Sequence, residues 1–391
     1  MRIALVWDAD YPWDVRVEKV ASSLIKEGHD VHLICRNTDQ RIRYEEIAGI
    51  KVNRLPVVVR RLRWLNSILT FPAFFNPIWL YFIWRIASQN KVEHIIVRDL
   101  PLCPAGIWVA KWLKVPCSMD MAECYPEMLR CIWKFEKFRF QNILVRNPYL
   151  ADLVEMYCLK RLSKIFAMIE ESRDRLIRKG VPAERVSIVS NTPSLALADS
   201  YKKARVPQEV FQIVYLGILN PSRGLDTVIE GMSVLQKQGV GCKLVVAGTG
   251  KAEADLRSLV QRHGVSESVE FLGWVTRDKV KDLFASASIG VVPHHVCGHW
   301  NSTIPNKLFD YMAAGVPVVS TNVGPMERII THNDCGRIYT DNDPESFART
   351  IVELGDRNLR ERLGENGRQA VLKTFNWEND ELKLTLAFSP T

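Results

Sequence analysis

A lysine and an aspartate stand three residues apart at the start of an expected helix in the segment 302–320, STIPNKLFDYMAAGVPVVS. Pro305 suits the first position of that helix, and Gly315 ends it before a Val-rich strand. Lys307 and Asp310 would then share one face near the N–H groups of the first turn. An ammonium and N–H groups suit phosphates, and a carboxylate accepts from ribose hydroxyls. The pattern favours a nucleoside diphosphate site over a merely solvated helix face.

A glycine-rich loop, Gly217-Ile-Leu-Asn-Pro-Ser-Arg-Gly224, joins an expected strand to an expected helix. Gly217 would let a ligand approach the strand end, and Arg223 would add a guanidinium to the N–H groups of the helix start. By contrast, the run that begins at Gly248 lacks the spacer of a P-loop, so we interpret it as a strand-ending turn. Arg223 and Lys307 are the two cations expected at this anion site.

Three other groups of residues have spacings that metal sites use. Asp8-Ala-Asp10 follows the opening strand and could serve a second substrate, whereas Asp341-Asn-Asp343 precedes a proline in the manner of a helix cap. The third group could bind zinc by its spacing and consists of His294, His295, Cys297 and His299. We interpret it as an exposed, flexible segment. No metal site is expected.

The elements that position these residues alternate between apolar strands and amphipathic helices. Each half of the chain opens with a strand, a helix and a second strand: Ile3–Trp7 and Val31–Cys35 in the first half, and Ile213–Leu216 and Lys243–Ala247 in the second. Further strands alternate with helices in both halves. The pattern predicts an α/β protein with two doubly wound, Rossmann-like parallel sheets.

The length of 391 residues exceeds what one core usually supports, so two domains are expected. Weak periodicity and two prolines indicate a linker within 190–209. We therefore expect a first domain over 1–195, a second over 205–374, and a terminal helix in 375–391 that packs elsewhere.

Composition separates the two halves. Residues 1–190 contain 30 Lys and Arg against 21 Asp and Glu, whereas 191–391 contain 22 against 23, so the net charge of +8 comes from the first half. An anionic partner of that half is expected. Nine scattered cysteines predict reduced thiols and a cytoplasmic protein. No segment has the pattern of a signal peptide or the length of a membrane span.

Basic and aromatic residues alternate in two stretches of the first half, which suits the surface of an anionic membrane. The first stretch contains Arg60, Arg61, Arg63 and Trp64 and leads into Phe71–Trp84; the second contains Arg130, Trp133, Lys134, Phe135, Lys137, Phe138 and Arg139. The alternative is that these are core aromatics with a solvated basic rim. We favour peripheral binding to the inner face of the membrane, and expect no nucleic acid partner because no recognition motif is present.

Taken in order, the motifs of the second half resemble the donor-binding domain of GT-B-fold, retaining glycosyltransferases of family 4. That resemblance is carried by Gly217–Gly224, Val245–Gly250, Phe271–Val275 and Pro305–Val319. The first half resembles the acceptor domain of the same family through Asp14–Val17, Val97–Pro101, Asp120–Glu127 and Asn191–Pro193. The resemblance covers nearly the whole chain. It implies two domains facing a cleft and a tail that crosses back to the first domain from about 375.

The resemblance also implies an activity: transfer of a sugar, with retention, from a UDP- or GDP-linked donor to a sugar or lipid-linked acceptor such as a polysaccharide precursor, with no metal or cofactor. The implied donor-binding residues are Gly217, Arg223, Gly224, Gly248, Trp274, Val275, Ser302, Thr303, Asn306, Lys307, Leu308 and Asp310. The acceptor side would contain Asp14, Arg16, Arg98 and Asp99, and the catalytic group Arg223, Lys307, Glu123 and Asp120.

The sequence departs from the family pattern at several of these positions. Ile218 stands where an arginine is common, Ser302 replaces one of two glutamates and Asp310 the other, and Ala122 stands where a histidine is expected. Because no nucleophile is evident, we expect same-face attack in which the departing phosphate takes the acceptor proton. Two alternatives stay open: a nucleotide-sugar epimerase on the same fold, and a catalytically silent scaffold that binds nucleotide sugar or membrane.

Overall fold

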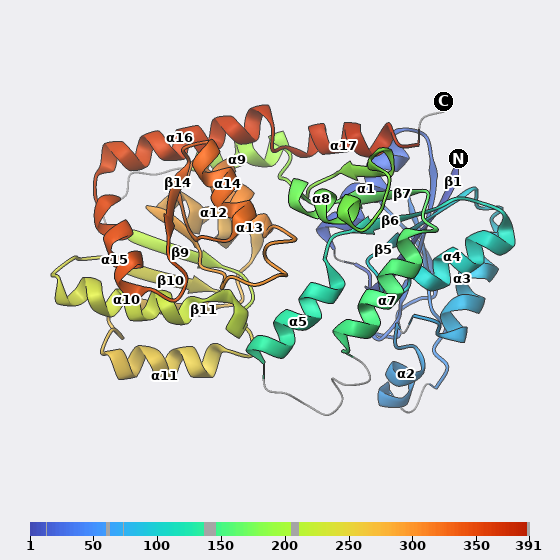
Figure 1. Ribbon diagram of the computed structural model, residues 1–391, viewed down its shortest axis with the longest axis horizontal. Helices are drawn as coiled ribbons and strands as arrows, with labels where there is room; N and C mark the ends of the chain where they lie inside the picture. Colours follow the sequence, from blue (N-terminus) through green and yellow to red (C-terminus); the bar gives the residue numbers. More distant parts are fainter. Residues whose placement is uncertain (13, 60–62, 73, 137–145, 205–210, 389–391) are drawn as a thin grey trace. The chain divides into compact units, whose positions relative to one another are not determined.

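The computed structural model describes the chain except residues 13, 60–62, 73, 137–145, 205–210 and 389–391. The chain divides into two compact units (Figure 1). Unit 1 comprises Met1–Leu129, Arg139–Ser190 and Asp380–Thr391, and unit 2 comprises Arg130–Phe138 and Asn191–Asn379. The division after Ser190 falls at the start of the segment we expected as a linker. Residues 130–138 group with unit 2, although we expected them in the first domain.

Unit 1 is built on an eight-stranded sheet in the order β3-β4-β2-β1-β5-β6-β7-β8, in which all neighbours are parallel except β3 and β4. Its strands are β1 (Arg2–Asp10), β2 (Asp30–Arg36), β3 (Tyr44–Ile47), β4 (Ile50–Arg54), β5 (His94–Arg98), β6 (Cys117–Met121), β7 (Lys164–Ala167) and β8 (Val186–Ile188). Its helices are α1 (Val15–Lys26), α2 (Arg63–Leu69), α3 (Pro77–Gln89), α4 (Cys103–Leu113), α7 (Pro148–Leu159) and α8 (Glu170–Arg178).

Unit 2 is built on a six-stranded, wholly parallel sheet in the order β11-β10-β9-β12-β13-β14. Its strands are β9 (Gln212–Leu216), β10 (Lys243–Ala247), β11 (Val269–Gly273), β12 (Ile289–Val292), β13 (Val318–Thr321) and β14 (Gly336–Tyr339). Its helices are α9 (Leu195–Ala204), α10 (Leu225–Lys237), α11 (Glu253–His263), α12 (Arg277–Ser286), α13 (Asn306–Ala313), α14 (Gly324–His332), α15 (Pro344–Glu353) and α16 (Arg357–Lys373).

Both sheets have apolar strands with helices packed on them, because parallel strands are buried on both faces. In unit 2, for example, Ile213, Leu244 and Val291 are fully or almost fully buried in one core. The predicted α/β fold with two doubly wound sheets is therefore confirmed.

The boundary between the two units falls within two helices, α5 and α17. Helix α5 (Tyr125–Phe135) begins in unit 1, and its residues from Arg130 belong to unit 2. Helix α17 (Trp377–Thr385) begins in unit 2, and its residues from Asp380 belong to unit 1. After α17, Phe388 packs on His94 and Phe166 of unit 1, with ring centroids 5.0 and 5.8 Å away. No helix among the described residues is long and apolar enough to cross a bilayer.

Candidate functional site

The strand order of unit 2 reverses between β9 and β12. From β9 the chain moves outward to β10 and β11, and from β12 it moves outward to β13 and β14 on the other side. The loops that leave the carboxyl ends of β9 and β12 therefore diverge, and α/β sheets bind ligands at such points. These two loops, residues 217–224 and 293–305, contain five of the twelve donor-side residues expected from the sequence: Gly217, Arg223, Gly224, Ser302 and Thr303.

Glycine is required twice in the loop after β9. Gly217 has φ of 139°, and a Cβ there would lie 2.8 Å from Nζ of Lys307. Gly224 has φ of 65°, and a Cβ there would lie 1.9 Å from the carbonyl oxygen of Pro293. The two loops therefore approach each other only because these side chains are absent.

Arg223 is fixed by the loop after β12. Its Nη1 donates to Nε2 of His294 at 2.5 Å, and its guanidinium carbon lies 4.3 Å from the ring centroid of Trp300. Burial, together with the charges of Arg223 and Lys307, holds the pKa of His294 well below its usual range, so a neutral imidazole accepts the hydrogen bond. The buried Nε of Arg223 has no partner among the described residues and remains available to a ligand.

Lys307 is a buried cation in the first turn of α13. The residue is 9% exposed, its Nζ lies 3.9 Å from the ring centroid of Tyr215, and no described residue accepts a hydrogen bond from that Nζ. Burial and then repulsion by Arg223 lower the pKa of Lys307, while Asp310 opposes them. Burying an ammonium without a hydrogen-bonding partner is unfavourable. The site is therefore built to receive an anion.

His295 also holds the loop after β12 in place. Its Nδ1 lies 2.7 Å from Oδ1 of Asp341 and its Nε2 lies 3.1 Å from Oδ1 of Asp226. Burial lowers the pKa of His295, but the hydrogen bonds that it donates to the two aspartates outweigh this effect and raise the pKa to about 9. The ring also stacks on Phe135 at 5.3 Å. The imidazolium thus ties the loop after β12 to α10 and to the end of β14.

The histidine-rich segment corrects one expectation. His294, His295 and His299 are at most 5% exposed, so the segment is buried and not an exposed, flexible stretch. Their position after a central strand explains this burial. No three His, Cys, Asp or Glu residues among the described part of the chain form a metal-binding group. In the Asp341–Asp343 pair, Asp341 contacts His295 and Asp343 caps α15, as expected for a helix cap.

The remaining donor-side residues differ in what they can offer a ligand. Ser302 is buried and its Oγ donates to the carbonyl of Gly298 at 2.7 Å. Leu308 offers nothing, because its side chain is fully buried and its N–H donates to the carbonyl of Pro305, which corrects its assignment. Trp274 is 83% exposed. Of the others, Thr303 is buried, Asp310 and Val275 are half-buried, Asn306 is exposed, and Gly248 begins the turn after β10 with φ of 145°.

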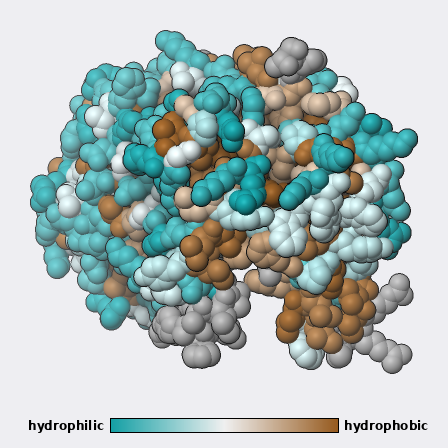
Figure 2. All heavy atoms as spheres, turned by 45° about the vertical axis from the view of Figure 1, so that its right-hand side comes forward, coloured by the Kyte–Doolittle hydropathy of each residue, from teal (hydrophilic) through white to brown (hydrophobic). Residues whose placement is uncertain are grey.

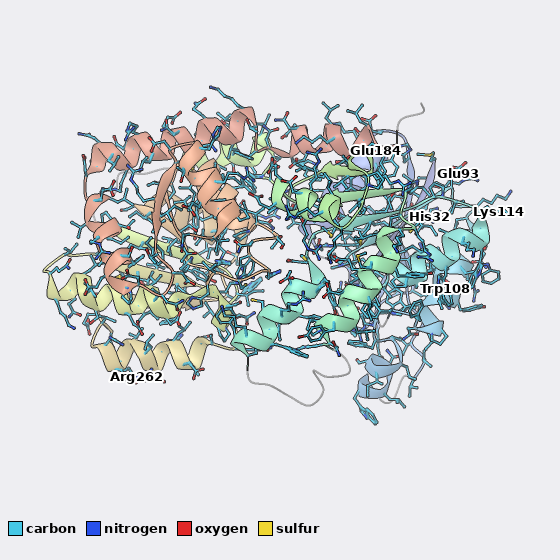
Figure 3. The ribbon with its side chains drawn as sticks, viewed as in Figure 1. His32, Glu93, Trp108, Lys114, Glu184 and Arg262 are labelled. Atoms are coloured by element: carbon cyan, nitrogen blue, oxygen red, sulfur yellow. The ribbon has the colours of Figure 1, made fainter. Side chains whose placement is uncertain are left out.

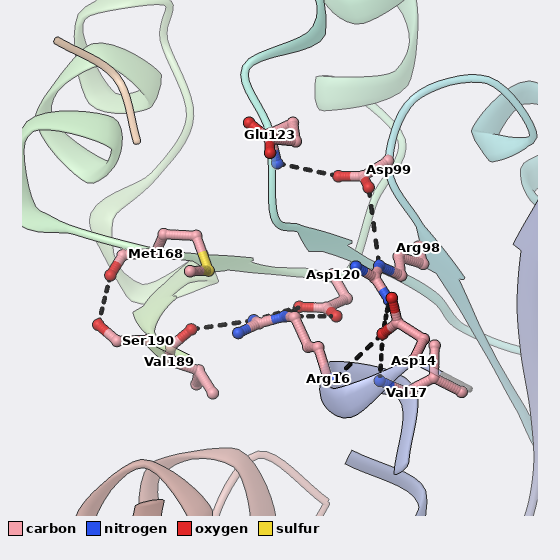
Figure 4. Close-up of polar contacts among 10 residues, drawn as sticks. All are labelled: Asp14, Arg16, Val17, Arg98, Asp99, Asp120, Glu123, Met168, Val189 and Ser190. Atoms are coloured by element: carbon pink, nitrogen blue, oxygen red, sulfur yellow. Dashed lines mark hydrogen bonds and ion pairs between the residues drawn. The ribbon is translucent and has the colours of Figure 1, made fainter. Parts of the chain in front are cut away.

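Unit 1 has a similar reversal of strand order between β1 and β5, and charged residues gather beside it (Figure 4). Asp14 caps α1 by accepting from the N–H groups of Arg16 and Val17, and it forms an ion pair with Arg98. The guanidinium of Arg98 also lies 5.5 Å from the ring centroid of Trp7. Asp14 and Arg98 therefore restrain each other at the carboxyl end of the sheet.

Two residues assigned to acceptor binding and catalysis form a structural pair instead. Nε of Arg16 donates to both carboxylate oxygens of Asp120, at 3.0 and 2.9 Å, and its Nη2 donates to the carbonyl of Val189 at 2.9 Å (Figure 4). Arg16 is 2% and Asp120 3% exposed. Asp120 is satisfied by Arg16 and shielded from solvent, so its carboxylate is not placed to orient an acceptor, whereas the buried Nη1 of Arg16 has no partner among the described residues.

Asp99 and Glu123 are two further carboxyl groups at this edge, and Asp99 also forms an ion pair with Arg98. Asp99 accepts from the backbone N–H of Glu123 at 3.0 Å (Figure 4). Burial, with repulsion from Glu123 and Asp120, raises the pKa of Asp99 to about 8 although Arg98 opposes the shift. Burial also raises the pKa of Asp8 nearby. A protonated carboxyl can donate a hydrogen bond as well as accept one, which suits a hydroxyl-rich ligand.

The two basic and aromatic stretches are only partly described. Arg60, Arg61, Lys137, Phe138 and Arg139 lie outside the described residues, as does the side chain of Arg63. Phe135 is half-buried and stacks on His295, and its place in a membrane-facing group stays a prediction. Trp64 is 63% exposed and keeps that role open.

Comparisons with known proteins agree with the geometry. Residues 199–370 match a model of glycosyl transferases group 1, and residues 14–192 match a glycosyl transferase 4-like domain. An uncharacterized glycosyltransferase of Methanocaldococcus jannaschii is 31% identical over 398 residues, covering 97% of this chain and 95% of its own.

Two solved structures share the fold at low identity. The sucrose-phosphate synthase of Thermosynechococcus elongatus is 17% identical with a TM-score of 0.77, covering 99% of this chain and 98% of its own. HepE of Anabaena, solved in complex with UDP-glucose, is 14% identical with a TM-score of 0.71 and covers 99% of both chains.

Proposed function

The chain belongs to the GT-B-fold glycosyltransferases of family 4, and on that premise we propose that it transfers a sugar, with retention, from a nucleoside diphosphate sugar held by unit 2. The acceptor is a hydroxyl-bearing sugar or lipid-linked sugar that binds at the carboxyl edge of the sheet in unit 1. The epimerase and the silent scaffold are the outcomes against which this proposal is tested.

One observation carries the donor assignment: the buried ammonium of Lys307 lacks a hydrogen-bond acceptor among the described residues and lies beside the guanidinium of Arg223. An anion placed between two neighbouring cations offsets their mutual repulsion, and a diphosphate supplies such a charge. The bare Cα of Gly217 next to Nζ of Lys307 leaves room for it. HepE, which shares the fold, was solved with UDP-glucose.

Arg223 and Lys307 would act on the leaving group. Charge develops on the diphosphate as the bond to the sugar breaks, and preorganised cations stabilise that charge more in the transition state than in the ground state. His294 holds the guanidinium in place before the substrate arrives. We propose that the departing phosphate oxygen takes the proton of the acceptor hydroxyl as that hydroxyl attacks the same face of the sugar.

We propose that this reaction needs no metal. Each Asp-x-Asp pair has other contacts: Asp341 binds His295 and the N–H of Val296, Asp343 caps α15, and Asp10 accepts from the N–H of Thr38. The positive charge that a cation would supply to the diphosphate comes from Arg223 and Lys307.

A lipid-linked acceptor and a peripheral membrane location are favoured by exposed aromatic and aliphatic side chains of unit 1. Helix α3 packs on α4, and α4 on α7. The exposed aromatic and aliphatic residues on these three helices are Tyr81, Trp84, Trp108, Trp112, Tyr149, Leu150 and Leu153. Those on α2 are Trp64 and Ile68. Hydrophobic residues gather over α2 in Figure 2, and Trp108 and Lys114 lie at α4 in Figure 3. Aromatic side chains with nearby lysines suit an anionic membrane interface.

The test of the activity is product analysis with purified protein, a panel of UDP- and GDP-linked sugars, and lipid-linked and free sugar acceptors. We expect transfer that survives EDTA, with the donor's anomeric configuration retained in the product by NMR. Conversion of the donor sugar without an acceptor would indicate the epimerase. Nucleotide-sugar binding without turnover on any acceptor would indicate the scaffold. An inverted product would contradict the same-face mechanism.

The membrane proposal has its own test, which is co-sedimentation with liposomes of neutral or anionic lipid at low and high salt. We expect binding to anionic liposomes that salt weakens, and a smaller bound fraction for Trp112→Ala. Trp274→Ala is the matched control, because Trp274 is an exposed aromatic residue of unit 2. Equal losses in both variants, or no binding to either lipid, would contradict the assignment.

A further inference from the structure

Two cysteines that no role above uses lie close together in unit 2. Cys131 is on α5 and Cys297 is in the loop after β12, 166 residues later in the chain, and their sulfur atoms are 3.1 Å apart. Both thiols are free. That separation is about 1 Å longer than a disulfide bond, so a small movement would join them.

The surroundings make Cys297 the reactive partner. The thiol of Cys131, the backbone N–H groups of Trp300 and His299, and the charge of Lys134 lower its pKa to about 7, although burial opposes the shift. The residue is half-buried, whereas Cys131 is 5% exposed. Thiolates attack disulfides, so Cys297 can begin an exchange that Cys131 completes.

The pair joins two segments that matter to the donor site. Cys297 lies two residues beyond His295 and three beyond His294, which bonds Arg223. Cys131 contacts the hydroxyl of Ser222, the neighbour of Arg223. A bond between the two sulfurs would fasten the end of α5 to the loop after β12.

We propose that Cys131 and Cys297 form a reversible disulfide that restrains the loop after β12, with a low-molecular-weight disulfide such as glutathione disulfide as the oxidant. The thiolate of Cys297 attacks one sulfur of glutathione disulfide, forms a mixed disulfide and releases one glutathione thiolate. Cys131 then loses its proton to water and attacks the sulfur of Cys297, which forms the protein disulfide and releases the second glutathione thiolate. The protein loses two electrons and glutathione disulfide gains them.

Another pair of cysteines provides an internal control. Cys103 and Cys158 contact each other in unit 1, but both are fully buried and burial raises the pKa of Cys103 well above its usual range. An oxidant in solution should not reach them before the protein unfolds. The control variant is Cys242→Ser, because Cys242 is half-buried and its thiol contacts the sulfur of Met232.

The experiment treats the folded full-length protein with glutathione disulfide and then maps its peptides by mass spectrometry without reduction. We expect a linked pair of peptides that contain Cys131 and Cys297, a mass loss of two hydrogens, and full reversal by dithiothreitol. The link should be absent in Cys131→Ser and in Cys297→Ser and present in Cys242→Ser. If one of the first two variants does not fold, the other suffices. The proposed disulfide between Cys131 and Cys297 would be overturned by a protein that stays reduced, forms only mixed glutathione adducts, or links Cys103 to Cys158 instead.

Amide hydrogen exchange then tests the restraint. Peptides from 293–303 should exchange several-fold more slowly in the oxidised protein than in the reduced protein, and Cys297→Ser should show no such difference. Unchanged exchange in a protein that carries the disulfide would overturn the proposed restraint.

Discussion

Replacing Lys307 with methionine should change stability and nucleotide affinity in opposite directions. Methionine fills nearly the same volume but needs no hydrogen bond. In the free protein the buried Nζ has no described partner, and an unsatisfied buried polar group costs about 1–3 kcal/mol. The contact with Tyr215 offsets about 0.5–2 kcal/mol of that cost. Lys307→Met should therefore leave the melting temperature unchanged or raise it by a few degrees.

Nucleotide binding should respond the other way. A hydrogen bond to a charged group contributes about 1.5–3 kcal/mol, so the variant should bind UDP or GDP roughly 10- to 150-fold more weakly. Calorimetric titration and thermal melting measure the two effects. Lys243→Met is the control, because Lys243 is a half-buried lysine of unit 2 in an ion pair with Glu270. A variant that melts several degrees lower, or that keeps the affinity of the wild type, would refute the reasoning.

The other predictions concern charge elsewhere. Asp120→Ala leaves Arg16 buried without its partner and should lower the free energy of unfolding by about 3–5 kcal/mol in urea, whereas Asp120→Asn should lose less; equal, small losses would contradict a structural pair. The pKa of His295 in the folded protein is about 9, above its ordinary value of 6.5. Its contribution to the free energy of unfolding is therefore complete below pH 6.5 and disappears as the pH rises through 9. Melting temperatures should show this decline in the wild type and a smaller one in Asp341→Asn. Arg223→Ala should cost about 2–4 kcal/mol of transition-state stabilisation, measured as kcat/KM, in a folded protein.

Strand and helix positions could be predicted from the sequence because apolar periodicity encodes them locally. The strand at Ile213–Leu216 and the helix stopped by Gly239 need no knowledge of distant residues. The same reasoning predicted that Arg223 and Lys307 lie near one sheet edge. Arg223 follows one strand of the parallel sheet and Lys307 begins the helix after another, and the carboxyl ends of parallel strands share an edge.

Pairings over long distances could not be predicted in this way. Arg16 and Asp120 are separated by 104 residues, and nothing local distinguishes a carboxylate that meets a buried guanidinium from one that meets a substrate. The histidines after β12 were misjudged because composition suggested exposure. Their place after a strand that pairs with β9 was the signal that could have corrected this, since loops at such a position lie over the sheet.

The two sheet edges differ in charge, and the difference supports their assignment to different substrates. At the edge of unit 1, carboxyl groups outnumber guanidinium groups, and burial with repulsion from neighbouring carboxylates raises the pKa of Asp99 to about 8. This environment repels a diphosphate and suits hydroxyl groups, which donate to carboxylates and accept from a protonated Asp99. At the edge of unit 2, Arg223 and Lys307 repel each other, and burial and their charges keep the pKa of His294 low, so an anion is the ligand that stabilises them. The basic excess of the first half of the chain therefore does not mark its ligand edge, and the anionic partner that we propose for this half would bind another surface.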